Sequence, residues 1–131
     1  MGVSPSEKPG ILDSILKERS MTRNKETDLQ LRIMAELAHE CVLFRIAAGL
    51  YWAGKYKDGI VTSPRAVKIA VRGYPDLAGY RRRDGKAVFI EVKTGKGKAT
   101  IEQEKFIKVA QESGCLAGIA WSIEDAREIV K

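Results

Sequence analysis

Apolar residues recur at helical spacing in residues 24–40, where Ile33 and Leu37 lie one turn apart and Leu29 and Met34 lie beside them. The pattern predicts an amphipathic helix over about residues 24–40. Such a helix buries its apolar stripe against the rest of a domain and leaves its polar side in water.

A second amphipathic stretch lies upstream at residues 11–19 (ILDSILKER), where isoleucines and leucines share one side. It predicts a short helix within an N-terminal arm of residues 1–23, ahead of a domain that spans residues 24–131. Two interpretations of this helix stay open. It is either an accessory or dimer contact made by the arm, or a helix packed on its own domain.

The hydrophobic period changes beyond residue 41, where short apolar runs alternate with glycine and polar residues. The clearest hairpin joins residues 76–82 to residues 86–93 through an Asp84-Gly85 turn. The other expected elements are strands at residues 42–46, 50–53, 67–71 and 116–121, a loop at 55–65, and a closing helix at 123–130.

Another helix begins at Thr100, since Thr100-x-x-Gln103 fits a capping box. The order of elements is helix, strands, helix, strand, helix. This order predicts an α/β fold with a mixed central β-sheet flanked by α-helices.

The charge of the chain favours a polyanionic partner. The formal net charge is +6 and the isoelectric point is about 9.4, and a basic surface speeds the encounter with nucleic acid. Cys41 and Cys115 have no metal-ligand spacing, which favours a reducing cytoplasm. We expect no membrane span and no signal peptide, because no long apolar run is present.

The candidate chemistry lies in the hairpin. Side chains alternate along a strand, so Val88, Ile90 and Val92 share the core face, whereas Glu91 and Lys93 share the other. The turn folds the preceding strand back, so that Asp76 can approach Glu91 although 15 positions separate them (91 − 76).

Two converging carboxylates repel each other, and a divalent cation relieves that repulsion. Asp76, Glu91 and the backbone carbonyl of Val92 are the oxygen ligands that Mg²⁺ prefers. The metal would polarise a phosphate and lower the pKa of a bound water. Lys93 would then orient that water or neutralise charge on the phosphoryl oxygens.

Each piece alone has an ordinary explanation. Pro-Asp is a common turn, and Glu-x-Lys on a strand is usually a solvated ion pair.

Two roles stay open for Gln103. It either completes the capping box alone or also faces the site, where it would orient Lys93 or a water. On the first helix, Glu26 and Glu40 both fall on the apolar face, at opposite ends.

These residues resemble a known family. The stretches Gly73-x-Pro75-Asp76 and Glu91-x-Lys93, with Gln103 downstream, resemble the PD-(D/E)XK nuclease superfamily, and more narrowly a stand-alone virus-type replication-repair nuclease (VRR-NUC) domain. The resemblance also takes in Glu26-x-x-x-Gln30 and Leu43-Phe44-Arg45, and it covers about residues 24–130.

The resemblance implies a restriction-endonuclease-like core and Mg²⁺-dependent phosphodiester hydrolysis, in which Mn²⁺ can replace Mg²⁺. It implies that Asp76, Glu91, Lys93 and Gln103 are catalytic, and that Glu26 binds metal with Asp76, Glu91 and Val92. Small stand-alone members, often from phages, are associated with homodimers that cut four-way (Holliday) junctions, so the cytoplasm of a bacterial or phage-infected cell is the expected location.

DNA would be held through its phosphates. We expect contacts from Arg45 and from Lys96 and Lys98, which lie between flexible glycines after the catalytic strand. Two further basic clusters are either DNA contacts or solvated surface, namely Arg81–Arg83 at the hairpin turn and Lys55 with Lys57 beside aromatic residues.

The expected function is a metal-dependent, structure-selective endodeoxyribonuclease acting on branched DNA as a homodimer. A two-fold axis suits paired cuts in a symmetric junction. The alternatives are a monomeric nickase or flap nuclease, and a non-catalytic DNA-binding repair module.

Overall fold

The computed structural model describes residues 24–46 and 49–131. The main sheet has the strand order β1-β4-β5-β6, with bounds Cys41–Arg45, Leu77–Arg81, Ala87–Val92 and Leu116–Ala120. β4 is antiparallel to β1 and β5, whereas β5 and β6 are parallel, so the sheet is mixed as predicted. The helix expected at residues 11–19 lies outside the described residues.

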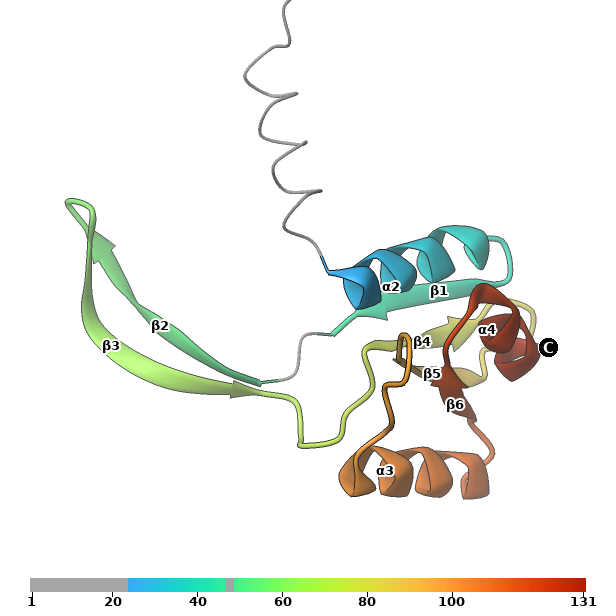
Figure 1. Ribbon diagram of the computed structural model, residues 1–131. Helices are drawn as coiled ribbons and strands as arrows, with labels where there is room; N and C mark the ends of the chain where they lie inside the picture. The colour runs from blue at the N-terminus through green and yellow to red at the C-terminus, as the bar shows by residue number, and fades with distance from the viewer. Residues whose placement is uncertain (1–23, 47–48) are drawn as a thin grey trace, which may run out of the picture.

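Helices cover both faces of this sheet (Figure 1). α2 (Lys25–Glu36) and α4 (Ile123–Val130) pack on one face, and α3 (Ile101–Glu112) packs on the other. The predicted α/β fold, a mixed sheet flanked by helices, is confirmed.

β5 runs between these two helical layers, and its alternate residues face different layers. Val88, Ile90 and Val92 are fully buried beneath α2 and α4, as their spacing predicted. Phe89 packs toward α3 with Ile107. The next residue on that side is Glu91, which brings a carboxylate under the beginning of α3.

The first helix is shorter than predicted. α2 ends at Glu36 and is capped at Leu37, and residues 37–40 form a turn in which the Leu37 carbonyl accepts from the amide of Cys41 at 2.8 Å. Leu37 is fully buried. Its position one turn after Ile33 extended the predicted helix beyond the residue at which the backbone leaves the helix. Glu40 therefore lies outside the helix.

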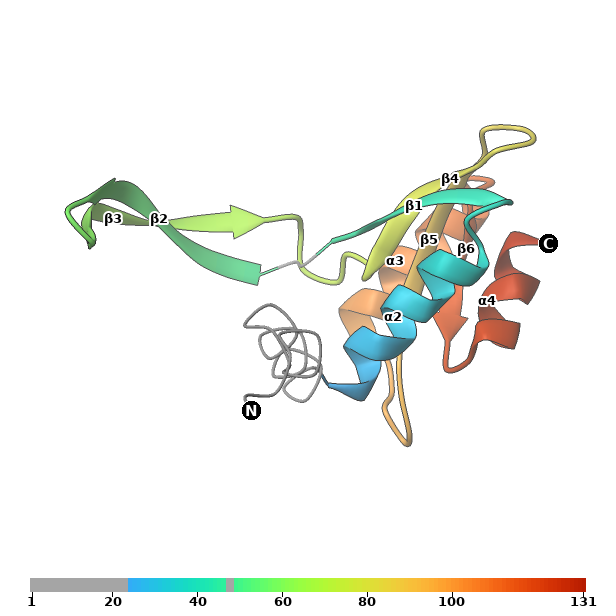
Figure 2. The same cartoon turned by 90° about the horizontal axis from the view of Figure 1, so that it is seen from above.

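The predicted loop at residues 55–65 is wrong. β2 (Gly49–Lys57) and β3 (Ile60–Ile69) form a long two-stranded hairpin, here called the β2–β3 arm. It turns at Asp58-Gly59, where both residues have positive φ (52° and 78°), as in the turns typical of tight hairpins. Figures 1 and 2 show the β2–β3 arm extending away from the four-stranded sheet.

None of the helices in the described ranges has the length and apolar character needed to cross a membrane.

Candidate active site

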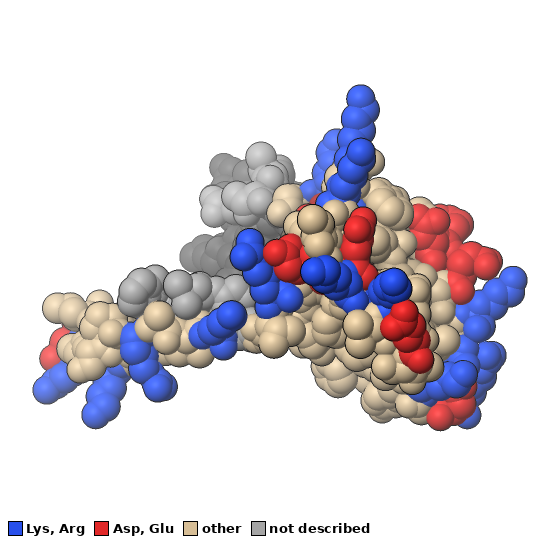
Figure 3. Space-filling model, turned by 90° about the horizontal axis from the view of Figure 1, so that it is seen from below, with Lys and Arg blue, Asp and Glu red and all other residues tan. Residues whose placement is uncertain are grey.

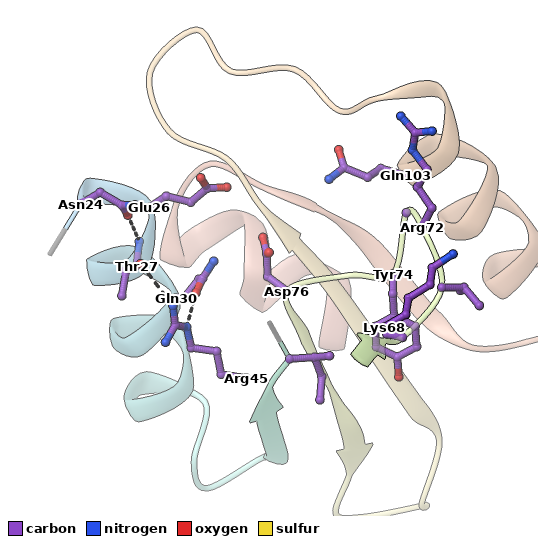
Figure 4. Close-up of a pocket in the computed structure, with 14 residues that line it drawn as sticks. Asn24, Glu26, Thr27, Gln30, Arg45, Lys68, Arg72, Tyr74, Asp76 and Gln103 are labelled. Carbon is purple, nitrogen blue, oxygen red and sulfur yellow. Dashed lines mark hydrogen bonds between the residues drawn. The ribbon is translucent and has the colours of Figure 1, made fainter. Parts of the chain in front are cut away.

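Three carboxylates from separate elements meet at one end of the main sheet. Glu26 comes from the first turn of α2, Asp76 from the residue before β4, and Glu91 from β5. One oxygen from each lies within 4.8 Å of the others. Figure 4 shows the Glu26 and Asp76 side chains pointing into the same space.

Local structure fixes the beginning of the helix that carries Glu26. Asn24 caps α2, with its side-chain oxygen accepting from the Thr27 amide at 2.7 Å. An acidic residue in the first turn is also favoured by the positive end of the helix dipole. Glu26 therefore occupies a position in which a carboxylate stabilises the helix.

Glu40, the other candidate from the helical face, lies at the far end. Its carboxylate is 3.7 Å from the Arg127 guanidinium. The structure thus places Glu26, and not Glu40, beside Asp76 and Glu91.

A glycine turn brings Asp76 to the sheet. Gly73 has a φ of +86°, and a Cβ there would lie 2.6 Å from the Glu102 carbonyl oxygen, so only glycine fits this close to α3. Asp76 is then held from both sides: its carbonyl accepts from the Ile46 amide at 2.7 Å, and its Oδ2 accepts from the Val92 amide at 3.0 Å.

Glu91 is the most enclosed of the three acids, with 2% of its surface exposed. Its Oε1 lies 3.3 Å from the Lys93 ammonium and accepts from the Gln103 amide at 2.8 Å. Burial, and then the charge of Asp76, raise the pKa of the Glu91 carboxyl to about 7, while Lys93 opposes the shift.

Gln103 fills both roles that its sequence position allowed. Its Oε1 accepts from the Thr100 amide at 2.8 Å, which completes the capping box, and its Nε2 donates to Glu91. The amide therefore contacts the Glu91 carboxylate, where we had expected it to orient Lys93 or a water.

The donor set fits a divalent cation. Within residues 24–46 and 49–131, Glu91 Oε2 is the buried side-chain polar atom that has no hydrogen-bond partner. A buried, unpartnered oxygen beside two other carboxylates is costly unless a cation binds there. Hard oxygen ligands of this kind suit Mg²⁺ or Mn²⁺.

Cationic side chains surround the acids. A pocket of about 620 Å³ is lined by Glu26 and Asp76 and also by Arg45, Lys68 and Arg72 (Figure 4). Such a combination of acids and cations can bind both a metal ion and the phosphate groups that it would act on.

Arg45 was expected from the sequence. Its Nε donates to Gln30 Oε1 at 2.7 Å, and this contact holds the guanidinium at the pocket. Lys68 and Arg72 were not predicted. Lys68 lies in the strand expected at residues 67–71, but its position at the pocket depends on the pairing of β3 with β2, which the loop expected at residues 55–65 did not include.

Lys96 and Lys98 are exposed on the loop after Lys93, and the lining of the 620 Å³ pocket, among the described residues, does not include them. The carbonyl of Gly97 between them accepts from Trp121 Nε1 at 3.0 Å. The loop is therefore attached to the end of β6.

The basic hairpin turn is partly structural. Arg81 is buried, and its guanidinium donates to Asp84 and to the carbonyls of Val130 and Lys131. The interpretation of Arg81 as solvated surface or a DNA contact is wrong. Arg82 and Arg83 are exposed.

The fold and site together define an α/β protein with a candidate divalent-cation centre and cations placed for a phosphate-containing substrate. The family model of the VRR-NUC domain matches residues 24–122, and the chain belongs to this family. It is therefore a nuclease domain acting on DNA. No curated protein sequence matches the chain.

Proposed function

We propose that this chain is a Mg²⁺-dependent endonuclease that selects branched DNA by its structure and cuts four-way junctions as a homodimer. One observation carries the metal dependence. Three carboxylates converge, and the most buried one keeps an oxygen without a partner.

Glu26, Asp76 and Glu91 would hold the metal, with the Val92 carbonyl as a further ligand and with Mn²⁺ able to replace Mg²⁺. The bound ion would polarise the scissile phosphate and supply a water of lowered pKa. Asp76 is oriented for this role by the Val92 amide, and Glu91 is oriented by Gln103.

Lys93 would act at the reacting phosphate. Its ammonium lies 3.3 Å from Glu91 Oε1 and its side chain is 16% exposed. A largely desolvated cation beside the scissile group stabilises charge that develops on the phosphoryl oxygens, and it can orient the attacking water.

Arg45, Lys96 and Lys98 would hold the DNA backbone, and Lys68 and Arg72 would assist at the pocket. Lysine and arginine contacts to phosphate carry no sequence information. Selection by shape follows, and a two-fold pair of these sites would suit the symmetry of a four-way junction. Residues 24–131 would form the nuclease domain, acting in the cytoplasm.

The test is a cleavage panel. Four-way junction, flap, splayed, duplex and single-stranded DNA are each incubated with Mg²⁺, Mn²⁺ or EDTA, using the wild type and Asp76→Asn. We expect metal-dependent cleavage of the branched substrates, paired cuts in the junction, and no cleavage by Asp76→Asn.

Sedimentation under the same conditions tests the homodimer. Cleavage in EDTA would contradict the metal dependence. Preferential cutting of a flap by a monomer would contradict the junction assignment, and absence of cleavage on every substrate would favour a DNA-binding module.

A further inference from the structure

The β2–β3 arm forms a sheet of its own, since its two strands pair with each other and not with the strands of the main sheet. A two-stranded ribbon by itself is at best marginally stable in water. Ile60 and Val61 at its turn are 66% and 51% exposed. The arm is therefore suited to contact with a partner molecule.

Charge indicates the chemistry of that partner. Residues 49–69 hold four cations and one acid, a net charge of +3 (4 − 1), and the cations are Lys55, Lys57, Arg65 and Lys68. All four are exposed. In Figure 3 the Lys and Arg side chains project along one side of the arm.

A bulge gathers three of these cations on one face. Lys55 and Lys57 are two residues apart in β2 and share a face. Arg65 pairs with Ala53, which is on that same face, although Lys55 pairs with Thr62. The extra residue in β3 between these pairs changes the alternation, which turns Arg65 to the side of the two lysines.

Positive charge also reaches the base of the arm beside the candidate active site, where Lys68 pairs with Leu50 and so lies on the opposite face from Arg65. Lys68 lies at the base of the arm and lines the pocket that also contains Asp76. Arg45 and Arg72 line the same pocket. Positive side chains therefore extend from the place of the proposed cleavage outward along the arm.

We propose that the β2–β3 arm lies along the duplex next to the cleavage point, with Lys55, Lys57 and Arg65 contacting its phosphates. This inference rests on the proposed function, because it takes the Glu26–Asp76–Glu91 site as the place of cleavage. Strands of 9 and 10 residues reach about 30 Å at about 3.3 Å per residue. That length is close to one turn of B-DNA, roughly 34 Å.

DNA fits this arm better than strand pairing with a second copy of the chain. Pro64 lies within β3, and Ser63 beside it has a positive φ of 50°. Proline, a bulge and lysines are features that prevent edge-to-edge pairing of strands. Two copies of a face with this charge would also repel each other.

The experiment measures how DNA affinity depends on the length of the duplex arms. Four-way junctions with equal arms of 6, 8, 10, 12 and 16 base pairs are titrated in EDTA, so that no cleavage occurs. The variant is Lys55→Gln/Lys57→Gln/Arg65→Gln. The control is Arg83→Gln/Lys86→Gln/Lys108→Gln, which removes the same charge from exposed positions outside the arm.

Wild type and control should bind more tightly as the arms lengthen to about 10 base pairs and then level off, since one turn of DNA has 10–10.5 base pairs. The arm variant should bind more weakly and lose this dependence. Its slope of log affinity against log salt should be smaller by about 2–3, as each phosphate contact contributes about 0.9.

An equal loss of affinity in the arm and control variants would overturn the proposal, as would unchanged length dependence in the arm variant. Conversion of a dimer to a monomer by the arm substitutions, with unchanged length dependence, would also overturn it and assign the arm to contact between copies. Because these titrations need no cleavage, they can succeed or fail independently of the proposed nuclease activity.

Discussion

The Gln103 amide donates a 2.8 Å hydrogen bond to Glu91 Oε1 while the same side chain closes the capping box of α3. The beginning of a helix and the central carboxylate are thus held by one residue. Glu91 is left with one oxygen fixed and the other, Oε2, buried and unpartnered. A carboxylate fixed in this way is prepared to bind a cation without reorganisation.

The two roles of Gln103 can be separated by substitution. Gln103→Glu keeps a side chain that can complete the capping box, but it replaces the donor to Glu91 with a second negative charge. We expect cleavage to fall about 10–100-fold, as for other residues that orient a metal ligand, while the capping box of α3 is kept.

Thr100→Ala is the matched control, because it removes the cap without touching Glu91. It should lower the free energy of unfolding by about 1 kcal/mol and leave the cleavage rate at saturation unchanged. Denaturant unfolding and single-turnover cleavage measure the two effects. Equal losses of activity in both variants would mean that Gln103 acts only through the helix.

The raised pKa of Glu91 makes metal binding depend on pH. Metal binding requires the ionised carboxylate and so releases its proton. With a pKa of about 7, affinity for Mg²⁺ or Mn²⁺ should rise up to about tenfold per pH unit below 7 and level off above it. Calorimetric titration in buffers of different ionisation enthalpy measures the protons released.

The raised pKa of Glu91 also makes the stability of the metal-free protein depend on pH. Stability falls as pH rises, whereas metal affinity increases. The folded chain holds the Glu91 proton more tightly than the unfolded chain does, so this contribution to stability is present below pH 4.5 and is lost as pH rises through about 7. Glu91→Gln should flatten that part of the profile of stability against pH. Affinity for metal that does not change between pH 5.5 and 7 would contradict this account of Glu91.

Arg81 should matter for folding and not for cleavage. It lies at the end of β4 opposite Asp76, and its Nη1 donates to the carbonyls of Val130 and Lys131 at 3.0 and 2.9 Å. Arg81→Met removes the donor to these two carbonyls and leaves the Asp84 carboxylate with the Lys86 amide as a donor. We expect the melting temperature to fall by about 5 °C or more, with unchanged cleavage at 20 °C.

The contribution of the Arg81–Asp84 ion pair to stability depends on pH. The Arg81 guanidinium holds the pKa of the Asp84 carboxyl well below its usual value. That contribution to stability is present above the ordinary pKa of 3.8 and is lost as pH falls below it.

Arg83→Met is the control for Arg81→Met, because it changes an exposed neighbour. It should leave the melting temperature within about 1–2 °C. A larger loss in Arg83→Met than in Arg81→Met would contradict the structural role of Arg81.

Trp121 should order the basic loop after Lys93. Trp121 is 45% exposed, and its indole Nε1 donates to the Gly97 carbonyl at 3.0 Å. Trp121→Phe removes this hydrogen bond. Amide exchange of residues 95–98 should become faster while that of α4 does not change, and DNA affinity should fall by about 2–10-fold. Unchanged exchange in the loop would show that the indole does not hold it.

Much of the site could be predicted from local rules. Strand alternation placed Glu91 and Lys93 together, and a two-residue turn signal predicted the hairpin that returns Asp76 to them. The structure brings these residues into contact distance. The choice between Glu26 and Glu40 could not be made from a helical face, because it depends on which end of α2 meets β5.

The β2–β3 arm was missed for a physical reason. Gly54 and Pro64 are usual marks of a loop, but here they lie at a bulge in paired strands. A Cβ on Gly54 would lie 2.7 Å from the Val61 side chain, so the glycine is needed for the close approach of the two strands. Asp58-Gly59, within the loop predicted at residues 55–65, is itself a dipeptide typical of a hairpin turn.

The most direct test of the central claim is to locate the metal. Crystals soaked in Mn²⁺ are measured at the manganese absorption edge for the wild type, for Glu91→Gln, and for Glu40→Gln as a control. Glu40 is a glutamate that lies away from the three acids and beside Arg127. We predict an anomalous peak among Glu26, Asp76 and Glu91 in the wild type and the control, and none there in Glu91→Gln. A peak elsewhere, or no peak in wild-type crystals of protein that cleaves DNA with Mn²⁺, would contradict the assignment of this site.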